Sequence, residues 1–309
     1  MNDRWKPVIW GVAALVLLLS LLTPLRALTI FFIMVPLVVL YTLQQPLVFA
    51  GSVMAIGLAV FILSGNYGLV TLIMFIFFLI PSIVMGQLYK QRKKALTVLL
   101  AGFGVLLAQL LLQLVLLSLQ LKLDLARELT AMFQDSLAQF ESQGLFEAGW
   151  AQETASALGS AIVTLLPMLL LLIAFLFAII THGLARRGLR LSGVEVPGLP
   201  QAKTWRLPKS LVWYYLLALI VSMIVPMNDT DFISVIAANL LPVLQFAFMV
   251  QAVGFFFFLA DLKRWSKAAP VLIAIGLFLL SSVIPIFSYA FIMIGLLDVA
   301  FPLRQHLTK

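Results

Sequence analysis

Amide side chains inside long apolar runs are the residues of this sequence most able to bind a ligand. Gln109 and Gln113 lie four residues apart in one such run, so a helix would place them on one face. Asn239 and Gln245 stand in a second run, and Asn66 lies in a short polar stretch between two others. Polar groups in such surroundings must find a partner or line a cavity. Two alternatives stay open: a pocket for a small organic solute, or ordinary hydrogen bonds between helices.

Acid–base and metal chemistry find few suitable groups. The chain has no cysteine and two histidines, His182 and His306, and its apolar runs contain no paired acids. The phosphate-binding GxxxxGK[ST], zinc-binding HExxH and nucleophile-elbow GxSxG motifs do not occur. We therefore predict no enzymatic activity, no catalytic residue, no metal and no cofactor. Both histidines are expected at the interfacial ends of helices.

The composition indicates the surroundings of these groups. Of 309 residues, 63% are hydrophobic and 10% are charged, and the mean hydropathy is +1.13. Soluble domains are about 45–50% apolar and about 25% charged, so much of this surface must face a lipid bilayer. The net charge of +8 could suggest nucleic acid, but the basic residues are spread over separate short stretches. We predict no nucleic-acid partner.

Apolar segments cover most of the chain, and a spanning helix needs about 20 apolar residues. The segments are 8–22, 27–43, 47–63, 69–85, 95–121, 157–181, 211–225, 235–259 and 269–301. The last would be about 50 Å long as one helix, so we predict that Pro285 divides it in two. The sequence thus predicts an all-α, polytopic transmembrane helical bundle with eight to ten spans, in a single membrane domain over 1–309.

Basic residues indicate the two sides of the membrane. With the N-terminus inside, most of the 20 lysines and arginines fall in loops on one side, as is typical of cytoplasmic loops. Among these are KQRKK at 90–94 and a basic cytoplasmic loop over 182–210. We predict a multi-pass protein of the bacterial cytoplasmic (inner) membrane with both termini in the cytoplasm.

Residues 122–156 form the long polar stretch on the other side. Six of them are acidic, and leucine, methionine and phenylalanine recur at helical spacing. We predict an extracytoplasmic, acidic and amphipathic helical hairpin. It would either cover the outer ends of the bundle or act as a lid over an outward-facing pocket.

Two further patterns concern packing. Gly51, Ala55 and Ala59 form a small-xxx-small ladder, which lets another helix approach closely, from the same bundle or from a separate subunit. Near the C-terminus, Asp298 lies six residues before Arg304. An acid at that depth is tolerated when a cation neutralises it, so we predict a structural ion pair rather than a proton relay.

Two stretches carry a resemblance to a known family: TWRLPKSLVWYYLLAL at 204–219 and GLLDVAFPLR at 295–304. With the apolar layout and the acidic outer stretch, they resemble the YybS-like family of bacterial membrane proteins over essentially the whole chain. That family is distantly similar to the S components of energy-coupling-factor vitamin transporters. The resemblance implies an S-component-like core with an outward-facing pocket. It also implies that the ladder of Gly51, Ala55 and Ala59 docks on a coupling subunit served by a separate ATPase.

The leading functional prediction is an integral inner-membrane protein that binds or transports a small organic solute. The alternative is a membrane scaffold that organises envelope or signalling proteins. A pocket lined by the amides favours the first, and a filled apolar interior favours the second.

Overall fold

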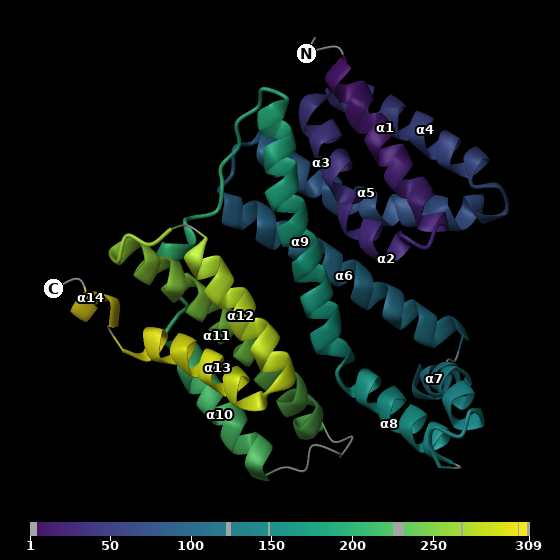
Figure 1. The fold of residues 1–309 in the computed structure, drawn as a ribbon. Coiled ribbons are helices and arrows are strands. Elements are labelled where there is room, and N and C mark those ends of the chain that lie inside the picture. The colour runs from purple at the N-terminus through teal and green to yellow at the C-terminus, as the bar shows by residue number, and fades with distance from the viewer. Residues whose placement is uncertain are drawn as a thin grey trace. The chain divides into compact units, whose positions relative to one another are not determined.

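The structure, a computed structural model, describes residues 5–121, 125–147, 149–224, 232–266, 268–301 and 303–307. These residues form helices, turns and loops without any β-strand, which confirms the all-α prediction (Figure 1). Contacts divide the chain into two compact units. Unit 1 is Met1–Leu123 with Leu170–Leu199, and unit 2 is Asp124–Leu169 with Pro200–Lys309. A single membrane domain over 1–309 stays a prediction, and each unit is described by itself.

Long apolar helices dominate the described residues. Seven helical stretches could cross a membrane by length and composition: Trp5–Leu22, Arg26–Leu43, Pro46–Leu63, Gly65–Lys90, Ala95–Leu117, Leu166–Leu191 and Ile233–Leu262. Three shorter apolar helices are Ser210–Ile224, Ala269–Ser281 and Pro285–Ala300. Within the described residues, each apolar segment predicted from the sequence is therefore mainly helical. The division at Pro285 is confirmed, because one helix ends at Val283 and the next begins at Pro285.

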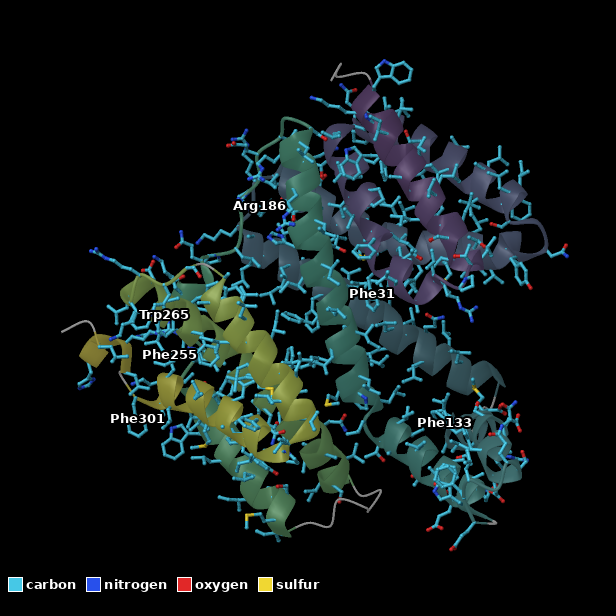
Figure 2. All side chains as sticks on the ribbon, viewed as in Figure 1. Phe31, Phe133, Arg186, Phe255, Trp265 and Phe301 are labelled. Carbon is cyan, nitrogen blue, oxygen red and sulfur yellow. The ribbon has the colours of Figure 1, made fainter. Side chains whose placement is uncertain are left out.

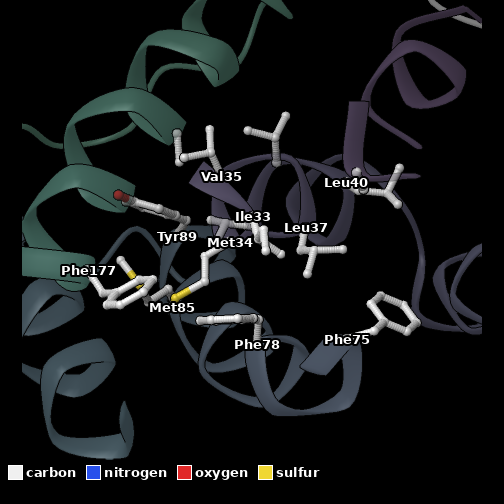
Figure 3. Close-up of a cluster of buried hydrophobic side chains, with 14 of the residues drawn as sticks. Ile33, Met34, Val35, Leu37, Leu40, Phe75, Phe78, Met85, Tyr89 and Phe177 are labelled. Atoms are coloured by element: carbon white, nitrogen blue, oxygen red, sulfur yellow. The ribbon is translucent and has the colours of Figure 1, made fainter. Parts of the chain in front are cut away.

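Unit 1 is built around one central helix. Its helices are α1 (Trp5–Leu19), α2 (Arg26–Thr29), α3 (Met34–Leu43), α4 (Pro46–Leu63), α5 (Gly68–Lys90), α6 (Ala95–Leu121) and most of α9 (Leu166–Leu191). A helix that is apolar all round must be buried; α3 is such a helix, and seven of its ten residues are buried. Figure 3 shows Met34 and Leu37 of α3 among aromatic and methionine side chains of α5 and α9. The interior of unit 1 is a continuous apolar cluster.

Unit 2 contains a helical hairpin and a four-helix group. The hairpin is α7 (Leu125–Ser142) with α8 (Trp150–Thr164). The group is α10 (Ser210–Ile224), α11 (Phe232–Leu262), α12 (Ala269–Val283) and α13 (Pro285–Ala300), followed by the short α14 (Leu303–Leu307). Within the group, α10, α12 and α13 all pack on α11. A side chain at Gly295 of α13 would collide with the Phe248 carbonyl, so glycine is needed for this close approach.

The hairpin is closed by small residues and one carboxylate. Ala151, Ala155 and Gly159 are buried in α8, and a Cβ at Gly159 would stand 2.5 Å from the Thr130 hydroxyl oxygen of α7. The Glu141 carboxylate accepts hydrogen bonds of 2.9 Å from the backbone N–H groups of Gly149 and Ala151. These bonds stabilise the charged form and lower the pKa of Glu141.

Two boundaries lie later in the chain than the sequence predicts. The predicted span over 157–181 begins inside α8, which continues to Thr164 because Gly159 packs on α7. The spanning helix α9 then begins at Leu166 and extends to Leu191, with Ala185 and Leu189 buried at helical spacing. The first part of the predicted 182–210 loop is therefore helical.

Candidate functional site

The amides predicted to bind a solute belong to both units, and each is described within its own unit. Gln113 and Asn66 are exposed, and Gln245 is half-buried. Gln109 donates from Nε2 to the Phe77 carbonyl at 3.2 Å. None of these residues, nor Asn239, lines any of the cavities described below. Their role in binding a solute stays a prediction.

Asn239 makes structural hydrogen bonds at the break between α8 and α9. Its Nδ2 donates to the Thr164 carbonyl at 2.8 Å and to the Val235 carbonyl at 2.7 Å. Its Oδ1 accepts from the Met168 backbone N–H at 2.9 Å. Helix ends leave backbone groups without intrahelical partners, and Asn239 satisfies one at each side of the break. This is the interhelical alternative left open by the sequence.

The small-residue ladder of α4 borders a groove. Gly51 and Ala55 are exposed and Ala59 is half-buried. Ala55 and Ala59 line an apolar groove of about 300 Å³ between α1 and α4, with Gln44 and Ser52 among its lining residues. Gln44 donates from Nε2 to Ser52 Oγ at 3.0 Å. Its Oε1 is buried and has no hydrogen-bond partner among the described residues.

An ion pair lies buried in unit 2. Arg304 donates from Nε to both Asp298 carboxylate oxygens, at 2.9 and 3.1 Å, and from an Nη atom to Asp298 Oδ2 at 2.5 Å. Gln251 donates from Nε2 to the same Oδ2 at 2.6 Å. All three residues are at most 5% exposed. The Arg304 guanidinium also lies 5.3 Å from the ring of Phe258 and 6.0 Å from that of Phe255, labelled in Figure 2.

This buried network joins the two stretches that carry the family resemblance. Arg304 donates to the Lys203 carbonyl at 2.6 Å. Gln251 accepts from the Leu207 N–H at 3.0 Å and donates to the Trp205 carbonyl at 3.3 Å. The segment before α10 is thus tied to α11, α13 and α14. We call Asp298, Arg304 and Gln251 the clasp.

A polar hollow of about 480 Å³ lies at one end of unit 1. It is lined by Thr42, Tyr89, Lys90, Arg92, Gly193, Val194 and Glu195. A smaller hollow of about 170 Å³ shares Glu195 and is lined by Arg186, Arg187, Arg190 and Val196. We call the cations and Glu195 around these two hollows the basic end of unit 1. Figure 2 labels Arg186 on α9.

Side chains of α1 and α9 hold the loop after α9 in place at the basic end. A Cβ at Gly188 would stand 2.7 Å from the Trp10 ring, so α1 and α9 approach closely there. Trp10 then donates to Ser192 Oγ at 3.1 Å, and Lys6 donates to the Ser192 carbonyl at 2.9 Å. These bonds fix the start of the loop that follows α9. Arg186 donates from Nε to the Val196 carbonyl at 3.3 Å and fixes its continuation.

A buried tyrosine–histidine pair stands behind the larger hollow. Tyr89 Oη lies 2.7 Å from His182 Nδ1, and the hydroxyl of Tyr89 points toward α9 in Figure 3. His182 is only 2% exposed and lies inside α9, well before its last residue Leu191, so the expected placement at a helix end is wrong for this residue. Its Nε2 and the Thr181 hydroxyl are buried without a hydrogen-bond partner among the described residues.

Arg92 has an unusual backbone conformation. Its φ of 52° is left-handed, a region that costs a non-glycine residue about 1–3 kcal/mol. It follows Gln91, the C-cap of α5, at the position where glycine is common. Arg264, after α11, has the same conformation with a φ of 55°. Arg92 lines the larger hollow, whereas Arg264 lines none of the cavities described.

Metal binding has no obvious centre in the part of the chain that the structure describes. No group of three or more His, Cys, Asp or Glu side chains lies close enough there to hold a metal ion. The polar chemistry of the described residues is concentrated in the clasp and at the basic end.

The number and length of the apolar helices among the described residues define a polytopic, all-helical integral membrane protein. The chain belongs to the family described as "Predicted membrane protein (DUF2232)", whose sequence model matches residues 11–299. It is 28% identical over 141 residues to the uncharacterized protein YybS of Bacillus subtilis (strain 168).

That match covers 46% of this chain and 44% of YybS, so the chain matches less than half of that relative's length. No solved structure matches the chain. These findings confirm the YybS-like family. The distant similarity to S components of energy-coupling-factor transporters stays a prediction.

Proposed function

We propose that the protein is a membrane-embedded subunit that acts through a partner, whose transmembrane helix docks in the groove between α1 and α4. In one form of the proposal the partner is a coupling subunit with a separate ATPase, and the complex moves a small organic solute. In the other form the protein is a scaffold for envelope or signalling proteins. Neither form assigns the chain a catalytic role.

The unpaired Gln44 oxygen beside the α4 ladder is the observation that carries this proposal. Helices associate in membranes through small residues that let backbones approach closely and through hydrogen bonds between helices. The groove offers both, because Ala55 and Ala59 line it and Gln44 Oε1 is buried without a partner among the described residues. A docked helix with a hydroxyl or amide donor near this oxygen would satisfy it.

The interior of unit 1 supports a role at its surface. Side chains of α3, α5 and α9 form a continuous apolar cluster, and the exposed Gln113 is outside it. Solute binding is a second candidate function, and the polar hollow at the basic end of unit 1 favours it.

Native mass spectrometry of gently extracted protein tests the docking. We expect the parent to retain a membrane partner and Ala55→Leu to lose it, because the added bulk fills the groove. Ala50→Leu is the matched control, since Ala50 is exposed on the same helix and does not line the groove. A parent without any partner, or an Ala55→Leu variant that keeps it, would contradict the proposal. The identity of the partner decides between the two forms.

We also propose that the protein lies in the bacterial cytoplasmic membrane with both termini and the basic loops inside. The asymmetric placement of lysine and arginine supports this orientation. Because the chain has no cysteine, single cysteines report directly on sidedness. Ser142→Cys should react with an impermeant thiol reagent in whole cells and Lys93→Cys should not. The reverse labelling would contradict the orientation.

A further inference from the structure

We propose that the basic end of unit 1 binds a phosphate ester, with Arg92 as the side chain that recognises the phosphate. This site is independent of the partner-docking groove. The ligand is either the headgroup of an anionic phospholipid or a soluble organic phosphate.

The charge around the two hollows favours an anion. Five cations line them, Lys90, Arg92, Arg186, Arg187 and Arg190, against the single carboxylate of Glu195. The C-terminal ends of α5 and α9 reduce this positive charge, because each helix C-terminus contributes about half a negative charge. These two ends and Glu195 together offset about two of the five positive charges. A phosphate ester with one or two negative charges would offset much of the remainder.

The cations are held in position but are not paired with a carboxylate of the described residues. Lys90 donates from Nζ to the Gln44 carbonyl at 2.6 Å and lies 4.3 Å from the centre of the Tyr41 ring. Those contacts fix its position, and no carboxylate of the described residues pairs with its charge. Glu195 makes no ion pair with the cations in the part of the chain that the structure describes.

Arg92 is placed as a ligand-binding side chain would be. Its backbone N–H donates to the Tyr89 carbonyl at 2.9 Å, and the next N–H, of Lys93, donates to the Leu88 carbonyl at 3.1 Å. Glycine would make this helix ending without strain. Among the described residues, no hydrogen-bond or ion-pair partner is found for the Arg92 guanidinium. A guanidinium binds phosphate through two parallel hydrogen bonds, which gives a reason for arginine at this strained position.

The size and depth of the larger hollow limit the class of ligand that can bind there. A volume of about 480 Å³ falls within the range of small-molecule sites and exceeds the need of a lone phosphate ion, so an organic part is expected. Lys90 is the last residue of a stretch that could cross a membrane, so the hollow lies at headgroup depth. Thr42 and Tyr89 add neutral polar and aromatic wall for the organic part.

The test compares two arginines with the same left-handed backbone. The full-length parent, Arg92→Gly and Arg264→Gly are placed in phosphatidylcholine nanodiscs. Their melting temperatures are measured with glycerol 3-phosphate and with chloride at matched ionic strength. Both glycine variants should melt at or above the ligand-free parent, because each relieves the same strain. Glycerol 3-phosphate should stabilise the parent and Arg264→Gly. For Arg92→Gly, the glycerol 3-phosphate concentration that gives half of the stabilisation should rise about 10- to 100-fold. Arg92→Lys should recover part of this loss of affinity.

A second set of nanodiscs separates the two sources of the phosphate. If phosphatidylglycerol stabilises the parent but not Arg92→Gly, while glycerol 3-phosphate has no effect, the ligand is a lipid headgroup. If glycerol 3-phosphate acts alone, the ligand is a soluble ester. The site is disproved if neither phosphate stabilises the parent beyond chloride, or if Arg92→Gly responds as the parent does.

Discussion

The clasp of unit 2 and the basic end of unit 1 are two polar clusters that differ in how many of their hydrogen-bonding groups have partners among the described residues. In the clasp, both Asp298 oxygens accept, Arg304 donates to Asp298 and Lys203, and Gln251 uses its oxygen and its nitrogen. At the basic end, the Arg92 guanidinium has no hydrogen-bond or ion-pair partner among the described residues, and Glu195 makes no ion pair with the cations there.

From this difference we infer that the clasp stabilises the protein and that the basic end binds a ligand. A satisfied buried network holds a unique arrangement, and breaking it is costly because a charge is left unpaired. An unsatisfied cluster has free hydrogen-bonding capacity that a ligand or partner can use. We therefore expect changes in the clasp to alter the stability of unit 2, and changes at the basic end to alter binding.

Asp298→Ala should have the largest effect on stability. Arg304 would keep its bond to the Lys203 carbonyl but lose its counter-charge inside the protein. Removing one partner of a buried pair typically costs about 3–5 kcal/mol, so unfolding of the detergent-solubilised protein should show a loss of that size. Asp261→Ala is the control, because its pair with Lys203 is exposed and such pairs contribute about 0.2–1 kcal/mol. Equal losses in the two variants would remove the distinction between the clasp and a surface pair.

Tyr89→Phe should have an intermediate effect in unit 1. It leaves His182 Nδ1 buried without its 2.7 Å partner, at a cost of about 1–3 kcal/mol. Replacing both residues with phenylalanine should cost less than the two single changes added together, because no orphaned polar atom remains at the pair. A double-mutant cycle measures this coupling. Additive costs would show that the pair does not stabilise unit 1.

Glu141→Gln should have the smallest effect, and one that depends on pH. The lowered pKa of Glu141 comes from the Gly149 and Ala151 N–H groups, so its contribution is present above the unfolded carboxyl pKa of about 4.3. It is lost as the pH falls through the lower folded value. The variant should therefore melt below the parent at pH 6, and the gap should narrow as the pH falls below the unfolded carboxyl pKa of about 4.3. Asp135→Asn, on the same helix, controls for loss of charge, and a gap that does not narrow in acid would contradict this account.

The helices and the ion pair could be predicted from the sequence for simple physical reasons. Apolar runs of sufficient length must be helical in lipid, and Pro285 cannot continue a helix from the preceding turn. Asp298 in an apolar helix requires a nearby cation, and Arg304 was the cation within reach. The end of the hairpin was misplaced because Ala157–Thr164 is apolar enough for a span, whereas its burial against α7 depends on the fold.

The rest of the polar chemistry depends on contacts between segments far apart in the chain. Gln251 and Asp298 are separated by 47 residues, and no local pattern joins them. The available signal was that Gln251 lies toward the predicted cytoplasmic end of its apolar segment, as Asp298 does. Tyr89 and His182 are separated by 93 residues, and no local pattern joins them. Arg92 was counted as a topology signal within KQRKK, and only its backbone conformation sets it apart.

Melting of Arg92→Gly and Asp298→Ala, each with and without glycerol 3-phosphate or phosphatidylglycerol, tests the central distinction most directly. The account predicts that Arg92→Gly keeps the stability of the parent and loses the stabilisation by phosphate. It predicts that Asp298→Ala melts well below the parent and, where still folded, keeps that stabilisation. If Arg92→Gly is destabilised while its response to phosphate is intact, or if Asp298→Ala loses only the response, the roles assigned to the two clusters are wrong.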